Sequence, residues 1–284
     1  MKISVTGGKG GTGKSTVAIN IATILARNKK VVLVDADVEC PNDHILTSTE
    51  LSCQEDSLIF RPKFDYSRCT KCRLCRDSCS ESAIVVFKEG YPFLMPSLCS
   101  GCKTCKLVCP ADAIKDDAKI IGSTFVSAVN ENLTLVTGVL KEGEERSYPL
   151  VLSTRKRSET ADSELEILDT SAGTGNHVAA AIEGSMFAIV VTEPTPLGTH
   201  DLKMILNLLE RLEVKGYLVM NRSDLVDDPP QIDGIETIGK IPLSDEIVDS
   251  YIKGRPVVEM YPESSASREF NRISEKLSDL IWQK

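Results

Sequence analysis

The sequence predicts an α/β fold, with helices on both faces of a mostly parallel sheet, into which a small α+β domain is inserted. Short, continuously apolar runs alternate with segments of helical periodicity along most of the 284 residues. Between residues 61 and 119 this alternation stops, and eight of the ten cysteines gather there. We therefore expect one domain formed by residues 1–60 and 120–284, and an inserted domain formed by residues 61–119.

The apolar runs predict the strands of the sheet. Residues 2–6 and 31–34 are the first two, and residues 14–27 between them carry apolar side chains at helical spacing. Runs that are apolar throughout, and not only at every second residue, indicate strands covered on both faces. Later strands are predicted at residues 133–136, 165–168, 188–191, 217–220 and 237–241, with a helix at 199–212.

The composition is that of a globular protein, with 42% hydrophobic and 26% charged residues. A formal net charge of -8 argues against a general nucleic-acid-binding protein, because such proteins concentrate positive charge. The N-terminal residues contain no apolar stretch long enough for a signal peptide or a membrane-spanning helix. We therefore expect a cytoplasmic protein that does not bind nucleic acid.

The C-terminal residues 268–284 predict an amphipathic helix. Its apolar face carries Phe270, Ile273, Leu277, Leu280 and Ile281. Glu275 and Asp279 interrupt the basic face that a membrane-binding helix uses. We expect this helix to pack on the larger domain and not on a membrane.

A glycine-rich segment separates the first predicted strand from the first predicted helix. Residues 8–15 read G-x-x-x-x-G-K-S, the phosphate-binding loop of P-loop NTPases. In such a loop backbone N–H groups surround the phosphates, Lys14 reaches their β and γ oxygens, and Ser15 ligates Mg²⁺. We expect ATP or ADP to bind here with Mg²⁺. The predicted nucleotide-binding residues of this loop are Gly8, Gly10, Gly11, Thr12, Gly13, Lys14, Ser15 and Thr16.

A second lysine in the loop indicates a narrower class. Residues 9–16, KGGTGKST, resemble the deviant Walker A motif of the MinD/ParA/Mrp ATPases, a class that includes the nitrogenase iron protein. The resemblance implies an ATP-dependent homodimer, or a heterodimer with a paralogue, that encloses two nucleotides. It also implies that Lys9 reaches the partner's nucleotide, as an arginine finger does, and acts in catalysis beside Lys14. The alternative is that Lys9 neutralises only the phosphates of its own subunit.

Three aspartates at the ends of predicted strands match the same class. Asp35 and Asp37 resemble the first switch, and the match implies that Asp37 orients the attacking water while Asp35 supports the Mg²⁺ site. Asp169 resembles the Walker B aspartate, which holds Mg²⁺ through water, and Gly173 the second switch. With Ser15, these three carboxylates are the predicted Mg²⁺ ligands.

The pair Asn221 and Arg222 follows the strand predicted at residues 217–220 and resembles the adenine-reading position of the class. The Asn221 amide would offer the base both a donor and an acceptor. By the same resemblance Pro242 borders the adenine pocket.

The clustered cysteines form an internal repeat with an offset of 30 residues. Each run has the spacing C-x2-C-x2-C-x3-C of bacterial ferredoxins, in which three cysteines bind one [4Fe-4S] cluster and the fourth binds the other. We therefore expect two clusters. The first is predicted on Cys69, Cys72, Cys75 and Cys109, and the second on Cys99, Cys102, Cys105 and Cys79.

Two other interpretations of the cysteines carry less weight. Disulfides are rare in the reducing cytoplasm. Zinc sites use two Cys-x2-Cys pairs, whereas each run here has three cysteines at three-residue steps and then a fourth. Cys40 and Cys53 fit no ligand spacing and are predicted to be ordinary core or surface residues.

These features predict an ATP-hydrolysing dimeric switch coupled to electron transfer through two [4Fe-4S] clusters, with an unidentified redox partner protein. The nitrogenase iron protein supplies the analogy, although its single cluster bridges two subunits. Three alternatives stay open: an iron-sulfur cluster carrier or assembly ATPase, a ferredoxin-type electron carrier on a nucleotide-sensing scaffold, and a MinD/ParA-like positioning ATPase.

Overall fold

The computed structural model describes residues 1–88, 90–226, 232 and 234–282. Its contacts divide the chain into two compact units. The first contains Met1–Glu55, Ser123–Leu140 and Ser147–Lys284, and the second contains Asp56–Gly122 and Lys141–Arg146. The second unit is thus longer than the predicted insert at both ends, and it also includes a short segment from later in the chain.

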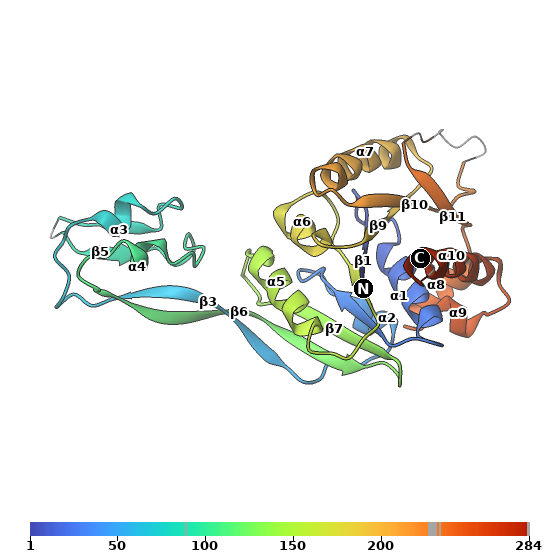
Figure 1. Ribbon diagram of the computed structural model, residues 1–284, viewed down its shortest axis with the longest axis horizontal. Helices are drawn as coiled ribbons and strands as arrows, with labels where there is room; N and C mark the ends of the chain where they lie inside the picture. Colours follow the sequence, from blue (N-terminus) through green and yellow to red (C-terminus); the bar gives the residue numbers. More distant parts are fainter. Residues whose placement is uncertain (89, 227–231, 233, 283–284) are drawn as a thin grey trace. The chain divides into compact units, whose positions relative to one another are not determined.

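Seven parallel strands form the sheet of the first unit (Figure 1). In spatial order they are β11 (Glu236–Ile241), β10 (Lys215–Asn221), β9 (Phe187–Thr192), β1 (Lys2–Thr6), β8 (Leu165–Asp169), β2 (Val31–Asp35) and β7 (Leu133–Leu140). The order continues with β6 (Ile114–Ala128) and β3 (Glu55–Phe64), in which the chain passes to the second unit. All five runs predicted after residue 34 lie in these parallel strands, which confirms a mostly parallel α/β sheet.

Helices cover both faces of this sheet because successive apolar residues of a strand point to opposite faces. Helices α1 (Lys14–Leu25) and α10 (Ser265–Trp282) pack on the face that presents Ile3 and Leu33. Helices α6 (Asn176–Ile182) and α7 (Pro196–Arg211) pack on the face that presents Val190 and Leu218. Helix α5 (Ser147–Ser158) lies against β7 and α6. Strands buried on both faces are mostly apolar, as their sequences indicated, although Ser4 in β1 and Glu166 in β8 are buried polar residues.

The C-terminal helix α10 begins at Ser265, before the predicted start at residue 268. Its apolar face is buried, with Phe270, Ile273, Leu277 and Ile281 in the same core as α1. Residues 283–284 of the predicted helix lie outside the described residues. Among the described residues, no helix has both the length and the apolar character needed to cross a membrane.

The second unit repeats one local structure twice. Two four-residue helices, α3 (Leu74–Asp77) and α4 (Thr104–Leu107), begin 30 residues apart. Each follows a left-handed residue, Arg73 with φ 66° or Lys103 with φ 65°. The hairpin of β4 (Ile84–Val86) and β5 (Pro92–Leu94) completes the unit. The sequence repeat is therefore also a repeat of backbone conformation.

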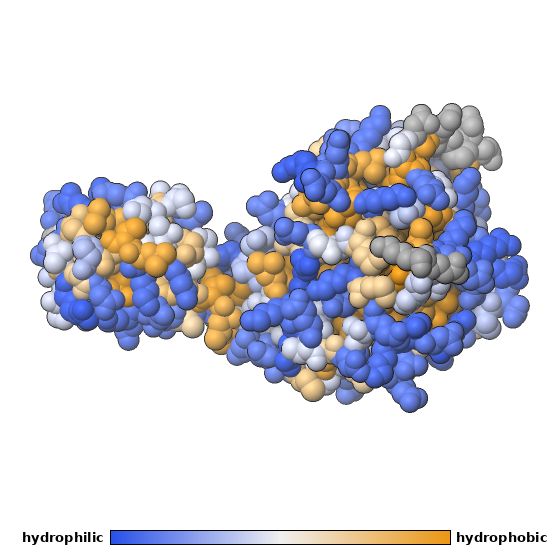
Figure 2. Space-filling model, in the orientation of Figure 1, coloured by the Kyte–Doolittle hydropathy of each residue, from blue (hydrophilic) through white to orange (hydrophobic). Residues whose placement is uncertain are grey.

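A small core joins these pieces. Phe60, Ile84, Leu94 and Ile114 are buried together with Cys105. Apolar residues also remain at the surface of this unit (Figure 2). The largest exposed ones include Leu74, Phe87, Phe93 and Leu107.

Candidate functional site

The phosphate loop lies between β1 and α1 and is tied to the end of β10. Gly13 has φ +92°, and a Cβ atom there would lie 2.3 Å from Nδ2 of Asn221, so glycine is required. That nitrogen donates a hydrogen bond to the Thr12 carbonyl at 2.8 Å. In this conformation the amide nitrogen of Asn221 therefore holds the loop.

The loop opens onto a cavity of about 1180 Å³. Ten of the predicted residues line it: Gly10, Gly11, Gly13, Lys14, Ser15, Thr16, Asp37, Asn221, Arg222 and Pro242. Gly8, Lys9 and Thr12 belong to the same loop but, in the part of the chain that the structure describes, not to this lining.

An apolar wall of the cavity was not predicted from the sequence. It is formed by α8 (Asp245–Ile252), where Ile247, Val248 and Tyr251 face the cavity, and by Leu243 just before it. The apolar spacing in residues 243–251 was the available signal, but it equally fits a helix packed on a core. Apolar and aromatic side chains beside Asn221 suit a planar base.

Lys14 is a buried cation at this site. Only 7% of its surface is exposed, and Nζ donates to the Lys9 carbonyl at 3.3 Å. Burial raises the pKa of Asp37, and it raises the pKa of Asp169 to about 7; the charge of Lys14 opposes both shifts. A buried ammonium group held by a carbonyl fits an anionic ligand such as a phosphate.

Two of the predicted Mg²⁺ ligands lie side by side at the carboxyl edge of the sheet. Asp35 ends β2 and Asp169 ends β8, and the two residues pair in register. Each is 1% exposed. The Ser15 hydroxyl is within hydrogen-bonding reach of Asp169 and lowers its pKa, against the larger effect of burial. Ser15, Asp35 and Asp169 are thus brought together, with Asp37 at the rim.

Asp43 is a fourth carboxylate that the sequence analysis missed. It is 0% exposed, and its backbone N–H donates to Asp35 at 3.1 Å. Burial, and then the charges of Asp35 and Asp169, raise its pKa well above the usual range. Within the described residues, neither carboxylate oxygen of Asp43 nor Oδ1 of Asp169 has a hydrogen-bond partner. Buried oxygens without donors fit a cation such as Mg²⁺.

Two further predicted residues are Lys9 of the phosphate loop and Gly173 of the second switch. Lys9 is exposed, and its carbonyl accepts from both Lys14 and Thr12. Gly173 has φ +97°, and its N–H donates to the Gly7 carbonyl at 3.1 Å. The second-switch segment is therefore hydrogen-bonded to the residue that directly precedes the phosphate loop.

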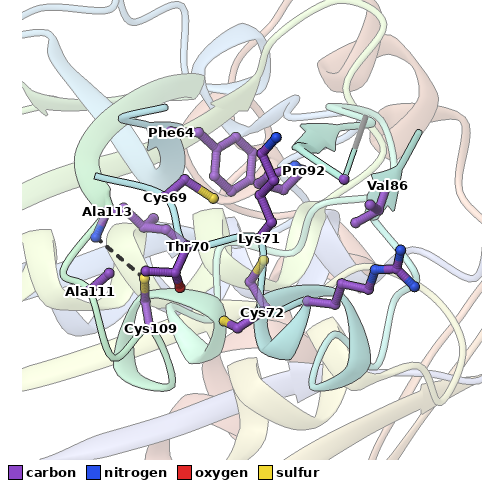
Figure 3. A pocket seen from close by; sticks show the side chains of 14 residues that line it. Phe64, Cys69, Thr70, Lys71, Cys72, Val86, Pro92, Cys109, Ala111 and Ala113 are labelled. Atoms are coloured by element: carbon purple, nitrogen blue, oxygen red, sulfur yellow. Dashed lines mark hydrogen bonds between the residues drawn. The ribbon is translucent and has the colours of Figure 1, made fainter. Parts of the chain in front are cut away.

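Two further cavities lie in the second unit, and each is lined by four cysteines. The first, of about 420 Å³, is lined by Cys69, Cys72, Cys75 and Cys109. The second, of about 320 Å³, is lined by Cys79, Cys99, Cys102 and Cys105. Figure 3 shows the sulfur atoms of Cys69, Cys72 and Cys109 around the first cavity. Each cavity thus gathers three cysteines of one run and the fourth cysteine of the other.

The cysteine side chains are crowded and partly buried. Burial raises the pKa of Cys75, and it raises that of Cys105 to about 11, with neighbouring thiolates adding to both shifts. Backbone N–H groups of Ala83 and Ala113 donate to Cys79 and Cys109, each at 3.3 Å. Four thiolates in one small cavity repel one another unless a cationic group lies between them. The donor set therefore fits an iron-sulfur cluster, which binds thiolates.

The same cysteines do not converge as ligands of a single ion. Among the described residues, no group of three or more His, Cys, Asp or Glu side chains is arranged to hold one metal ion. Cys40 and Cys53 are exposed and line neither cavity.

Comparison with known proteins identifies the nucleotide-binding part. The family model described as "CobQ/CobB/MinD/ParA nucleotide binding domain" matches residues 3–257. An uncharacterized protein of Methanocaldococcus jannaschii is 34% identical over 99% of this chain and 98% of its own length. The iron-sulfur cluster carrier protein of Pyrococcus abyssi is 24% identical over 97% of this chain and 85% of its own length.

A solved structure gives the same fold. The septum site-determining protein MinD of Pyrococcus horikoshii, complexed with Mg-ADP, aligns with a TM-score of 0.62 and 20% identity. The alignment covers 99% of this chain and 97% of that protein. Because the family model matches most of the chain, the chain belongs to the CobQ/CobB/MinD/ParA nucleotide-binding family.

Proposed function

We propose that this protein is an ATP-hydrolysing dimeric switch whose second unit carries electrons through two [4Fe-4S] clusters. The observation that carries the proposal is the sorting of eight cysteines into two cavities, each with three cysteines of one run and one of the other. Such crossed sets are typical of two-cluster ferredoxins. They occur in a chain whose other unit has the P-loop ATPase fold.

On the nucleotide side, each group has a distinct task. The Lys14 ammonium would bind the β- and γ-phosphates, and Asn221, Arg222 and Pro242 would border the base. Asp37, which lines the cavity, would accept a hydrogen bond from the attacking water and orient it toward the γ-phosphate.

Bound Mg²⁺ would neutralise the negative charge that develops during hydrolysis. Ser15, Asp35 and Asp169 would hold it, and the oxygens of Asp43 would face it.

Lys9 is proposed to act in the partner's site. Its own loop already contains Lys14, which is buried and directed at the carbonyl of residue 9. Lys9 is exposed, as a residue must be to cross a dimer interface. Positive charge supplied from a second subunit would stabilise the transition state only when the dimer has closed. Hydrolysis would then depend on dimerisation.

On the cluster side, the protein holds and shields the redox groups. Cys69, Cys72, Cys75 and Cys109 would bind one cluster, and Cys99, Cys102, Cys105 and Cys79 the other. Each cluster when bound supplies a one-electron redox centre. The N–H groups of Ala83 and Ala113 would stabilise thiolate charge on Cys79 and Cys109. The exposed apolar residues of this unit offer a surface to a redox partner protein.

A second candidate function is delivery of an iron-sulfur cluster to another protein. The relative in Pyrococcus abyssi that bears the name iron-sulfur cluster carrier protein favours it. Transfer requires a labile site, whereas each cavity here provides four cysteines, a complete ligand set for a stable cluster. Incubation with a metal-free acceptor protein separates the two. An electron carrier keeps its iron, and a cluster carrier loses it as the acceptor gains it.

The proposal is tested on anaerobically purified protein by measuring iron, acid-labile sulfide and ATPase rate in one preparation. We expect about eight iron and eight sulfide per chain, and Mg²⁺-dependent hydrolysis. Lys14→Ala should weaken ATP binding about 10- to 100-fold and leave the iron content unchanged, because it removes a charge-assisted phosphate contact. Lys30→Ala, an exposed lysine paired with Asp162, is the matched control. Protein without iron, or with full activity in Lys14→Ala, would contradict the proposal.

A further inference from the structure

A short connection between β7 and α5 is hydrogen-bonded to Val38 and Glu39, which follow Asp37, and to Cys99 of the second cysteine set. Residues 140–147, which we call the strap, leave the first unit at Leu140 and return to it at Ser147. The residues between them, Lys141–Arg146, belong to the second unit. The strap therefore joins the two units through covalent bonds at each of its ends.

Both ends of the strap are hydrogen-bonded to the first-switch segment. The N–H of Leu140 donates to the Val38 carbonyl at 2.8 Å, and the Ser147 hydroxyl donates to the Glu39 carboxylate. Val38 also packs on Gly138 of β7, where an added Cβ would lie 2.6 Å from a Val38 methyl group. Val38 and Glu39 directly follow Asp37, the residue proposed to orient water. A movement of this switch would therefore move the ends of the strap.

The middle of the strap is fixed to the second cysteine set. Nη1 of Arg146 donates to the Cys99 carbonyl, and the N–H of Lys141 donates to the Ile121 carbonyl at 2.9 Å. Glu144, whose side chain is 5% exposed, holds Arg146 from one side and Lys119 from the other. Two cations and one carboxylate leave a net positive charge beside Cys99.

The two cysteine cavities differ at the position where this charge matters. Lys71 and Arg73 line the first cavity. In the second cavity Lys103 stands at the position of Arg73, but Gly101 stands at the position of Lys71. The second cavity therefore has one basic side chain fewer in its lining than the first. Arg146, which lies outside the cysteine repeat, supplies a cation near this second cysteine set.

We propose that the strap couples the first switch to the second cysteine set, with Arg146 as the positioning residue at Cys99. Nucleotide binding shifts Val38 and Glu39, the strap transmits the shift, and the contact between Arg146 and Cys99 changes. Because a cation near a cluster favours its more negative, reduced form, the reduction potential of the second cluster then depends on the nucleotide. This inference rests on the proposed function, since it requires both sites to be filled.

The test is a redox titration of the clusters by electron paramagnetic resonance, with and without a non-hydrolysable ATP analogue and Mg²⁺. In the wild type we expect the analogue to shift one of two potentials. Arg146→Gln should lower that potential and remove its response to nucleotide, whereas Arg146→Lys should keep the potential closer to that of the wild type. Ser147→Ala should leave the nucleotide-free potential unchanged but lose the response, and Ser147→Thr, which keeps the hydroxyl, should restore it.

Controls separate this inference from the proposed function. Arg68→Gln removes an exposed arginine beside Cys69 that pairs with Asp112, and it should leave the response intact. Iron content and analogue affinity are measured for every variant. If wild-type protein binds the analogue and holds both clusters but shows no shift in reduction potential, the proposed coupling through the strap is wrong. The proposed function would not be affected by that result. A response that persists in both Ser147→Ala and Arg146→Gln would also overturn the proposed coupling.

A second readout needs no cluster. In metal-free protein, the alkylation rate of Cys99, measured by mass spectrometry, should change when the analogue binds, because Arg146 contacts that residue. The change should be lost in Ser147→Ala, while the alkylation rate of exposed Cys53 should not respond. If the alkylation rate of Cys99 does not change in wild-type protein saturated with the analogue, the proposed coupling through the strap is wrong. Analogue binding is measured in the same preparation, because a variant that does not fold would lose this binding altogether.

Discussion

Asp35 and Asp169 lie in register at the ends of neighbouring parallel strands, and each is 1% exposed. Such a pair is stable as two negative charges only if a cation or a set of donors compensates it. Asp35 has three backbone donors, from Asp37, Asn42 and Asp43 at 3.2, 3.0 and 3.1 Å. Among the described residues, Oδ1 of Asp169 has no hydrogen-bond partner, so a cation bound at this edge of the sheet would stabilise it.

The stability of the metal-free protein should fall as pH rises from about 4 to 7. Burial raises the folded-state pKa of Asp169 from 3.8 to about 7. Between these values the folded state binds more protons than the unfolded state, so raising pH favours unfolding, by on the order of 1 kcal/mol per pH unit. Urea denaturation in a chelator at several pH values measures it. Asp169→Asn should flatten the dependence, and exposed Asp162→Asn should not. A stability that rises over this range would contradict the assignment.

Asp43→Asn should make the metal-free protein more stable and its Mg²⁺ binding weaker. An amide removes the repulsion with Asp35 and Asp169, and about 1 kcal/mol or more of stability should be gained. The loss of one carboxylate facing the cation should weaken Mg²⁺ binding in the presence of nucleotide by roughly tenfold. Thermal denaturation in chelator and Mg²⁺ titration test the two parts. Unchanged Mg²⁺ affinity would remove Asp43 from the cation site.

Cys109→Ser should damage the cluster of the first cysteine set, although Cys109 belongs to the second run. Cys109 lines the cavity of Cys69, Cys72 and Cys75. Iron content should fall from about eight toward about four per chain, and the remaining spectrum should be that of the second set. Cys53→Ser, at an exposed cysteine outside both cavities, should change neither. Selective loss of the other cluster would show that the ligation is not crossed.

Lys9→Ala should bind ATP nearly as well as the wild type but fail to dimerise and hydrolyse efficiently. Lys9 is exposed, and we propose that the buried Lys14 binds the phosphates of its own site, so the loss of Lys9 should change ATP affinity little. Charge supplied in trans is worth about 10³-fold or more in related reactions, so a large loss in turnover is expected. Anaerobic sedimentation with ATP and Mg²⁺ measures dimerisation. Wild-type dimerisation and turnover in this variant would assign Lys9 to its own nucleotide.

Candidate residues could be listed from the sequence where the chemistry depends on local spacing. The phosphate loop and the two cysteine runs each fit within a few dozen residues, and their residues meet as spacing predicts. Asp43 was missed because it is the first residue of a short helix, where an acidic residue is an ordinary feature of a helix start. The strap was missed because residues 141–146, with Gly143, read as a surface loop. Only tertiary contacts reveal that Glu144 and Arg146 belong to the second unit.

Strands β3 and β6 were also missed, for a different reason. Their burial changes from residue to residue, and much of each strand is exposed. A continuous apolar run marks a strand buried on both faces, and a partly exposed strand in a charged segment has no such run. The boundaries predicted at residues 61 and 119 therefore fall inside the strands and not at their ends.

We propose that ATP controls electron transfer through the clusters, and the rate of cluster reduction tests this proposal. Anaerobic protein with a measured iron content is mixed with a fixed electron donor, and the rate of cluster reduction is followed with and without ATP and Mg²⁺. We expect the rate to depend on ATP in the wild type and to lose this dependence in Lys9→Ala at unchanged iron content. Equal rates with and without ATP, in wild-type protein that holds both clusters and hydrolyses ATP, would contradict it.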